Sequence, residues 1–372
     1  MKVVVTGGGT GGHIYPALAL VKEIQRLEPG SEFIYIGTEN GLESDIVPRS
    51  GIRFETINIS GFQRKLTWKN IRTIWRFWRG TARAKQIMKG FGADIVIGTG
   101  GYVAGPVVFA ASKLDIPSLI HEQNSVPGLT NKFLSRYVDK VAVSFEDSAA
   151  YFPAEKVRYT GNPRASEVTG ERPRSPLQGL GLEENKKTVV VVGGSRGARP
   201  INEAFLDSLP EAANRNWQYL YVTGSAHYDK VIEEVERAGN PGNVVIHPFI
   251  HNMPAVLSYA DLLISRAGAT TLAEITALGL PSILIPSPYV TNNHQEKNAK
   301  SLSSRGAAVV RTENEWNAEV LLQDSDRILS DDAKWQKMHE AALTLAAPGA
   351  AEKIFRLMED MMKPPRLEEE GK

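Results

Sequence analysis

The feature that most constrains the fold is a strand, a glycine-rich loop and a helix that occur in this order twice, about half a chain apart. Lys2–Thr6 is a short β-branched run that enters Gly7–Gly12 and then a segment with helical apolar spacing. Thr188–Val192 enters Gly193–Gly197 and a second helical segment in the same way. The repetition predicts two similar α/β halves.

Further strands are expected where short, continuously apolar runs are separated by segments of helix length, a pattern typical of parallel sheets covered by helices on both faces. A chain of 372 residues is also too long for one ordinary core, since such cores stop growing at about 250–300 residues. We therefore predict two Rossmann-like α/β domains with a central cleft. The further strands are expected at Phe33–Ile36, Ile95–Ile97, Ser118–Ile120 and Lys140–Val143 in the first half, and at Tyr219–Val222, Val244–Ile246, Leu262–Ile264 and Ser282–Ile285 in the second.

The turn Thr160–Arg164 and the Pro-rich and Gly-rich stretch that follows it to Gly181 mark the best domain boundary. We expect an N-terminal domain at 1–163 and a C-terminal domain at 164–340. The remainder, 341–372, is expected to form a helix and a charged tail.

The composition of the chain limits the cellular compartments and the classes of binding partner that we expect for it. The chain has no cysteine, which removes disulfides, thiolate metal sites and a cysteine nucleophile and fits a reducing compartment. Only three valines separate Lys2 from Thr6, too few for the apolar region of a signal peptide, so we expect a cytosolic protein. Lysine and arginine total 43 against 42 aspartate and glutamate, a balance that argues against a nucleic-acid binder.

Positive charge is nevertheless concentrated at Arg64–Lys89, which has nine basic residues and no acidic one. Core packing alone would explain one apolar helical stripe here, but not the basic stripe beside it. Cations beside aromatic residues are expected where a helix lies on an anionic lipid surface, with nucleic acid as the rival partner. The apolar stripe is Ile71, Ile74, Trp75, Trp78 and Ala82; the basic one is Lys69, Arg72, Arg76, Arg79 and Arg83; Trp68 and Phe77 accompany them.

Gly7, Gly9 and Gly12 match the dinucleotide fingerprint, in which glycines let backbone N–H groups and a helix N-terminus approach a phosphate. A nicotinamide enzyme would also need an acidic residue at the end of its second strand to hold the ribose, but that strand ends in Ile36-Gly37. A dehydrogenase is therefore disfavoured, and a purely structural tight turn remains the alternative.

Polar side chains follow this loop and the strand that ends at Ile120. His13 stands at the expected start of a helix, whose dipole disfavours the imidazolium, so the neutral ring can accept a proton or simply pack. His121–Asn124 come at the carboxyl end of a strand, which faces the ligand crevice in open α/β sheets. An ordinary solvated loop is the alternative for this segment.

In the second half, Ser265–Glu274 reads as a strand exit, a glycine turn and a helix start. Thr271 and Glu274 have the spacing of a capping box, but Glu274 is equally suited to accept hydrogen bonds from sugar hydroxyls. The segment Asn292–Glu296 contains several side-chain amides, which could bind the hydroxyl groups of a ligand but are also common in ordinary turns. Asp324 and Asp326 mimic the Asp-x-Asp of metal-dependent sugar transferases, but their neighbours read as a helix, and we expect no metal site.

Seven ordered segments carry a family resemblance: Gly7–His13, Gly100–Pro106, His121–Asn124, Gly161–Arg164, Gly193–Ala198, Gly268–Glu274 and His294–Glu296. Together they resemble the MurG family of GT-B peptidoglycan glycosyltransferases, over nearly the whole chain to about residue 345. The resemblance implies metal-independent, inverting transfer of N-acetylglucosamine from UDP-N-acetylglucosamine to the muramoyl 4-hydroxyl of lipid I, giving lipid II, without a cofactor. A UDP-N-acetylglucosamine 2-epimerase of the same fold is the alternative.

The resemblance also implies roles for individual residues. His13 is the first candidate for the base that takes the acceptor proton, and Glu122 is the second. Because the acceptor's polyprenyl chain stays in the bilayer, a peripheral protein at the cytoplasmic face of the membrane is implied, docked through Trp68, Arg72, Trp75, Arg76, Trp78 and Arg79. In the donor site, Ser195 would bind the diphosphate, Ile250 the uracil and Glu274 the ribose. Gln295 would bind the sugar, and Arg164 would lie near the phosphate. The helix start at Ala269 and Thr270 belongs to the same site, and Thr10, Gly11, Gly12 and Asn124 would complete it from the first domain.

Overall fold

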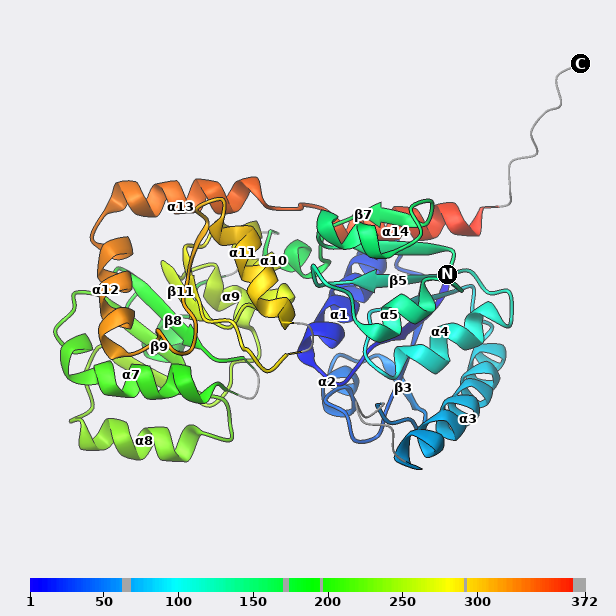
Figure 1. Cartoon of the computed structure of the whole chain (residues 1–372), viewed down its shortest axis with the longest axis horizontal. Helices are drawn as coiled ribbons and strands as arrows, with labels where there is room; N and C mark the ends of the chain where they lie inside the picture. The colour runs from blue at the N-terminus through cyan, green and yellow to red at the C-terminus, as the bar shows by residue number, and fades with distance from the viewer. Residues whose placement is uncertain (62–67, 170–173, 195–196, 291–292, 364–372) are drawn as a thin grey trace, which may run out of the picture. The chain divides into compact units, whose positions relative to one another are not determined.

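The buried β-branched runs form the strands of two separate parallel sheets. The computed structural model describes residues 1–61, 68–169, 174–194, 197–290 and 293–363. These residues form two compact units, one of Met1–Pro163 together with the chain from Gly349, and one of Arg164–Pro348 (Figure 1).

The first unit has a seven-stranded parallel sheet in the order β3-β2-β1-β4-β5-β6-β7. Successive side chains of its strands point to opposite faces, so that Val4 packs under α3, α4 and α5 while Val3 and Val5 pack under α1, α2 and α14. Its strands are β1 (Lys2–Thr6), β2 (Glu32–Gly37), β3 (Arg53–Thr56), β4 (Ile95–Gly98), β5 (Ser118–Glu122), β6 (Lys140–Val143) and β7 (Val157–Tyr159). Its helices are α1 (Gly11–Leu27), α2 (Glu43–Arg49), α3 (Trp68–Phe91), α4 (Ala104–Ser112), α5 (Leu129–Leu134), the 3-10 helix η1 (Glu146–Tyr151) and α14 (Ala350–Met362).

The second unit has a six-stranded parallel sheet in the order β10-β9-β8-β11-β12-β13. Its strands are β8 (Thr188–Val192), β9 (Gln218–Val222), β10 (Val244–His247), β11 (Leu262–Ser265), β12 (Ser282–Leu284) and β13 (Ala308–Val310). Its helices are α6 (Arg164–Val168), α7 (Arg199–Ala212), α8 (Tyr228–Arg237), α9 (Met253–Leu257), α10 (Ala269–Leu278), α11 (His294–Ser303), α12 (Ala318–Leu329) and α13 (Asp332–Thr344), with the 3-10 turn η2 (Gln178–Leu180).

The strand order changes direction once in each sheet, next to the strand that a glycine loop follows: β1 in the first sheet and β8 in the second. In the first unit β1 and β4 are neighbours, and Thr6 lies opposite Gly98. In the second, β8 and β11 are neighbours, and Val192 lies opposite Ser265. Open α/β sheets bind ligands outside the carboxyl ends of their strands at this reversal, so the fold marks one site in each unit.

The C-terminal segment divides between the units. Helix α13 ends at Thr344 in the second unit, whereas α14 packs on α1 of the first, where Ile354, Phe355 and Met358 are fully or almost fully buried. The segment 341–372, which the sequence set apart from both domains, is therefore shared between them: residues up to Pro348 belong to the second unit, and α14 belongs to the first. Within the described ranges, no helix combines the length and the apolar character needed to cross a bilayer.

Candidate active site

The first glycine loop holds the ring of His13, the third residue of α1. Its Nδ1 lies 2.9 Å from the carbonyl oxygen of Gly8 and 3.2 Å from the hydroxyl of Thr10. Because a carbonyl oxygen only accepts hydrogen bonds, Nδ1 must carry the proton in the neutral ring, and Nε2 is then the basic nitrogen. This tautomer is the one that a general base acting through Nε2 requires.

The loop after β4 supports the same ring from the side. Gly101 has φ +82°, and a Cβ added there would lie 2.3 Å from the carbonyl oxygen of Gly8, so only glycine permits this approach. A Cβ at Gly100 would lie 3.0 Å from Cδ2 of His13. The hydroxyl of Thr99 donates to the His13 carbonyl oxygen at 2.7 Å. The two loops at the strand-order reversal thus pack against each other around His13.

Glu122 is buried at the carboxyl end of β5, and both of its oxygens hold the loop that follows. Oε1 accepts from the backbone N–H and the side-chain amide of Asn124, at 3.0 and 3.1 Å. Oε2 accepts from the Gly128 N–H at 3.2 Å and from the Asn131 amide at 2.8 Å. Four donors on one carboxylate favour a structural role for Glu122 and leave His13 as the better candidate for the base.

Three of the four polar residues at His121–Asn124 are buried, so this segment is not a solvated loop. His121 donates through Nε2 to the carbonyl oxygen of Gly161 at 3.0 Å, and its Nδ1 lies 3.1 Å from the amide nitrogen of Gln123. Burial lowers the pKa of His121 to about 4, although the hydrogen bond to Gly161 opposes that shift. A ring that stays neutral in this way anchors the turn at the end of the first unit.

The lowered pKa of His121 predicts a loss of stability in mild acid. In the unfolded chain the ring gains its proton near pH 6.5, while the folded ring resists it until about pH 4. The stabilisation is therefore complete above pH 6.5 and falls by roughly 3 kcal/mol as the pH drops to 4. Urea denaturation as a function of pH measures this slope. His121→Gln removes the titrating group and should flatten the curve over this range; an equally steep curve in that variant would assign the slope to other groups.

In the second unit, Glu274 forms a buried ion pair. Its Oε1 accepts from Nε of Arg164 at 2.6 Å, and Nη1 of Arg164 also binds the carboxylate of Glu167. Burial disfavours the charged guanidinium, but the carboxylates of Glu274 and Glu167 outweigh this effect and raise the pKa of Arg164. The capping box does not form, since α10 begins after Gly268 without a side-chain cap. The structure instead brings together two residues that the resemblance assigns to the donor site.

The other donor residues predicted in the second half of the chain follow carboxyl ends of strands in this sheet. Ala269 and Thr270 open α10 after β11, and the hydroxyl of Thr270 is buried with no hydrogen-bond partner among the described residues. Ile250 is half-buried after β10. Gln295 lies in α11 after β12 and accepts from the Ser287 N–H at 2.9 Å. Ser195 lies outside the described residues.

The Asp-x-Asp pair is part of a helix, as predicted. In α12, Asp324 accepts from Nε and Nη2 of Arg311, at 2.7 and 2.9 Å, and Asp326 binds Arg215 through two bonds of 2.9 Å. Both carboxylates are therefore committed to ion pairs. Within the part of the chain that the structure describes, no three histidine, aspartate or glutamate side chains group as metal ligands would.

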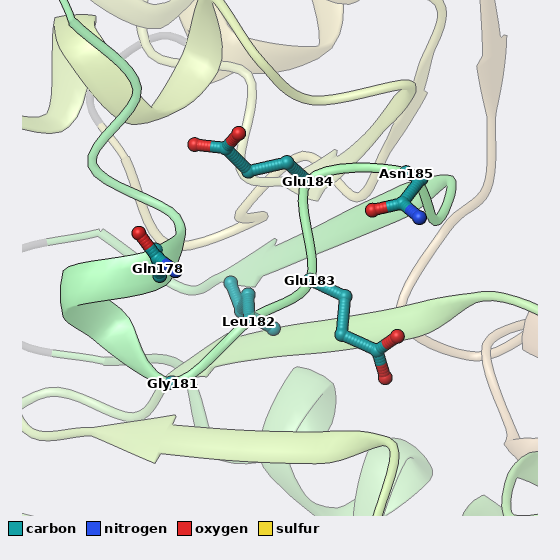
Figure 2. A pocket seen from close by; sticks show the side chains of 6 residues that line it. All are labelled: Gln178, Gly181, Leu182, Glu183, Glu184 and Asn185. Carbon is teal, nitrogen blue, oxygen red and sulfur yellow. The ribbon is translucent and has the colours of Figure 1, made fainter.

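A surface pocket of about 460 Å³ lies elsewhere in the second unit, beside η2 and the loop before β8 (Figure 2). None of the predicted site residues lines it. Two of its residues are the acids Glu183 and Glu184, whose charges would repel a diphosphate. Its lining is Gln178, Gly181, Leu182, Glu183, Glu184 and Asn185.

Helix α3 exposes three members of the apolar stripe that core packing would have buried. Ile74, Trp75 and Trp78 are 49%, 56% and 58% exposed. The guanidinium of Arg79 lies 4.6 Å from the centre of the Trp75 ring, while Arg76 donates to the hydroxyl of Ser60. The side chain of Trp68 lies outside the described residues.

Helix α4 lies beside α3, and α5 lies beside α4 (Figure 1). The buried Phe109 of α4 connects the exposed rings of α3 to those near α5. Ring centroids 5.0–6.1 Å apart connect Trp78 through Phe109 to Phe133 and Tyr137. Leu129, at the start of α5, is 76% exposed. We call Ile74, Trp75, Trp78, Leu129, Phe133 and Tyr137 the aromatic face.

Comparison with known proteins agrees with this geometry. Residues 3–143 match the glycosyltransferase family 28 N-terminal domain, and residues 188–354 match its C-terminal domain. The chain is 59% identical over 363 residues to a UDP-N-acetylglucosamine--N-acetylmuramyl-(pentapeptide) pyrophosphoryl-undecaprenol N-acetylglucosamine transferase of Halalkalibacterium halodurans, covering 98% of this chain and 100% of the relative. The chain belongs to glycosyltransferase family 28 and, within it, to the MurG family.

Solved structures agree on the fold. The crystal structure of Acinetobacter baumannii MurG is similar with a TM-score of 0.73 and 31% identity, over 96% of this chain and 99% of that one. A Neisseria meningitidis UDP-GlcNAc 2-epimerase bound to UDP-GlcNAc has a TM-score of 0.71 at 14% identity, covering 97% and 100% of the two chains. The second likeness is one of fold alone, and the two α/β units have the GT-B architecture.

Proposed function

We propose that this chain transfers N-acetylglucosamine from UDP-N-acetylglucosamine to the muramoyl 4-hydroxyl of the undecaprenyl-diphosphate-linked acceptor lipid I, which gives lipid II. The observation that carries the proposal is the 59% identity along the whole length of a transferase named for this donor and this acceptor. The geometry supports it, because the first unit fixes a histidine in the tautomer that a base needs.

The chemistry follows from the charges that change during transfer. The donor sugar is α-linked and the product β-linked, so one displacement inverts the anomeric carbon. In our proposal Nε2 of His13 takes the proton of the acceptor hydroxyl as that oxygen attacks. Thr10, Gly11, Gly12 and Asn124 are further substrate-binding residues of the first unit.

The departing diphosphate gains charge and needs donors. The first turn of α10, at Ala269 and Thr270, presents backbone N–H groups at the positive end of the helix dipole. In the sequence, Ser195 follows β8, the strand that pairs with β11. Preorganised donors of this kind contribute about 2.7–4 kcal/mol each in other enzymes. In our proposal they replace a metal ion.

We assign the rest of the donor as follows. Glu274 binds the ribose and Arg164 lies near the phosphates. Their buried ion pair supports this assignment, because Arg164 holds the carboxylate of Glu274 in one position on α10. Ile250 presents its backbone to the uracil, and Gln295 contacts the sugar.

The direct test mixes the purified chain with labelled UDP-N-acetylglucosamine and a lipid I analogue. We expect a disaccharide-linked lipid and free UDP, with and without EDTA. If the donor is instead converted to UDP-N-acetylmannosamine without any acceptor, the chain is an epimerase. Loss of transfer with EDTA that returns with Mg²⁺ would contradict the metal-independent mechanism.

We also propose that the aromatic face docks on an anionic membrane as a peripheral contact, which brings the enzyme to its lipid-linked acceptor at the cytoplasmic face. Exposed tryptophans suit the headgroup region, and Arg72, Arg76 and Arg79 lie on the same helix. The aromatic rings and the cations together favour a lipid surface over nucleic acid.

Charge reversal tests this docking. Replacing Arg72, Arg76 and Arg79 with glutamate should weaken binding to anionic vesicles by about 100-fold or more, because each cation near such a surface contributes about 1 kcal/mol. Sedimentation with anionic and zwitterionic vesicles measures it. Reversal of Arg199, Arg237 and Arg327, which are exposed in the second unit, is the control with the same net charge. Equal binding by the two triple variants would defeat the proposal.

A further inference from the structure

Glu43 is a buried acid beneath the first glycine loop that sequence patterns did not reveal. It begins α2, and none of its surface is exposed. Its Oε2 accepts from the Gly9 N–H at 3.0 Å, and its Oε1 accepts from the N–H and the hydroxyl of Thr38 at 3.2 and 2.6 Å. These partners are all donors, which suits an ionised carboxylate. Among the described residues, no lysine or arginine forms an ion pair with it.

The backbone closes tightly around this carboxylate. A Cβ added at Gly8 would lie 2.6 Å from its carboxyl atoms, and one added at Gly41 would lie 2.2 Å from them. Removing a carboxylate from water costs free energy that its hydrogen bonds only offset, so an apolar side chain would serve better if packing were the only role of this position. The arrangement points to a task that requires a carboxylate at this position.

The task is visible in the peptide group that joins Gly8 to Gly9. Its N–H, on Gly9, donates to Glu43, while its C=O, on Gly8, accepts from Nδ1 of His13 at 2.9 Å. Because a trans peptide is planar, its N–H and C=O point in opposite directions and cannot turn independently. Holding the N–H on one side therefore aims the carbonyl at the histidine on the other.

Electrostatics act in the same direction. A carboxylate on the N–H polarises the peptide group, which makes the carbonyl oxygen a stronger acceptor for the Nδ1–H. A stronger acceptor at Nδ1 favours the tautomer with its lone pair on Nε2. It also stabilises the positive charge that develops when Nε2 takes a proton.

We propose that Glu43 is a positioning residue that acts on His13 through the single Gly8–Gly9 peptide group. The carboxylate fixes the peptide, and the peptide fixes both the orientation and the tautomer of the ring. The catalytic part of this inference rests on the proposed function of His13 as the base; the structural part does not.

The first test reads the tautomer directly. In Glu43→Gln, the amide has one acceptor oxygen where the carboxylate had two, so it cannot accept from both Gly9 and Thr38. Asp45→Asn is the matched control, because it removes the same charge two residues later on α2, at a side chain that is 66% exposed. ¹⁵N NMR of the seven histidines, with the His13 signal assigned by its absence in His13→Ala, reports the proton on each nitrogen.

We expect one tautomer, protonated at Nδ1, in the natural chain and in Asp45→Asn, and a mixture of tautomers in Glu43→Gln. An unchanged tautomer in Glu43→Gln overturns the proposal. If Glu43→Gln does not fold, Thr38→Val takes its place, because it removes only the 2.6 Å hydrogen bond to Oε1. A smaller shift toward the mixture is expected there, and no shift counts against the proposal.

The second test reads the consequence for transfer. Glu43→Gln should lower kcat by about 10- to 100-fold, by analogy with the loss seen when a partner that orients a metal-binding histidine is removed, with little change in KM for UDP-N-acetylglucosamine. Combined with His13→Ala, it should cause no additional loss. Additive losses overturn the coupling. If His13→Ala keeps its activity, the proposed base is wrong, but the tautomer measurement still decides what Glu43 does.

Discussion

Replacing His13 with alanine is expected to lower kcat by about 10²–10⁴-fold, the usual contribution of a positioned general base, while the Kd for UDP-N-acetylglucosamine stays nearly unchanged. The ring is held by Gly8 and flanked by Gly100 in the first unit. The residues proposed for the ribose, the uracil and the sugar, which are Glu274, Ile250 and Gln295, are in the second unit. Steady-state kinetics with a lipid I analogue and calorimetry with the donor measure the two quantities separately.

Two observations separate loss of the base from loss of structure. Added imidazole should restore part of the activity of His13→Ala, because a small base can enter the space that the ring leaves, but it cannot repair a misfolded loop. The free energy of unfolding of the variant, measured with urea, should also stay close to that of the natural chain. Near-normal turnover in His13→Ala would remove His13 as the base and return attention to Glu122.

Replacing Glu274 with alanine is expected to lower the free energy of unfolding of the second unit by about 3 kcal/mol, the lower end of the range for breaking a buried ion pair. The side chains of Arg164 and Glu274 are only 10% and 7% exposed, so the variant leaves a guanidinium buried with less compensation. Glu167 still contacts Arg164 and limits the loss. Urea denaturation measures the change, and donor affinity should fall with it.

A control variant and a double variant test whether the loss of stability comes from breaking the buried ion pair. Glu203→Ala breaks an exposed pair with Arg199 in the same unit and should cost about 1 kcal/mol or less. Replacing Arg164 with methionine and Glu274 with leucine together removes both charges and should recover most of the lost stability without recovering donor binding. A Glu274→Ala variant no less stable than Glu203→Ala would contradict the energetic role of the pair.

The fold was largely predictable, because most strands are buried on both faces and therefore read as continuous apolar runs. All ten predicted strands are present to within two residues. The strands that the sequence did not reveal are β3, β7 and β13, and each lies at the edge of its sheet. Edge strands carry polar residues or are short; Arg53–Thr56 includes two charges, and Ala308–Val310 has only three residues.

The sequence predicted that most candidate site residues follow the carboxyl ends of strands, but it did not predict their contacts. The glycine fingerprint located the first loop and predicted that its backbone N–H groups bind a phosphate. One of these groups, the N–H of Gly9, instead donates to Glu43. The spacing of Thr271 and Glu274 suggested a cap, but Glu274 binds Arg164, which lies 110 residues earlier. Spacing encodes contacts within one helical turn; these partners come from segments that only the folded sheet brings together.

The course of helix α14 determines when the first unit can be completed during synthesis. This helix buries Ile354, Phe355 and Met358 against the unit that starts at Met1, so the apolar surface of α1 stays uncovered until nearly the whole chain has left the ribosome. The second unit, which is continuous in sequence, has all its residues available first. A nascent chain stalled before Gly349 would therefore carry one unit that can close its core and one that cannot.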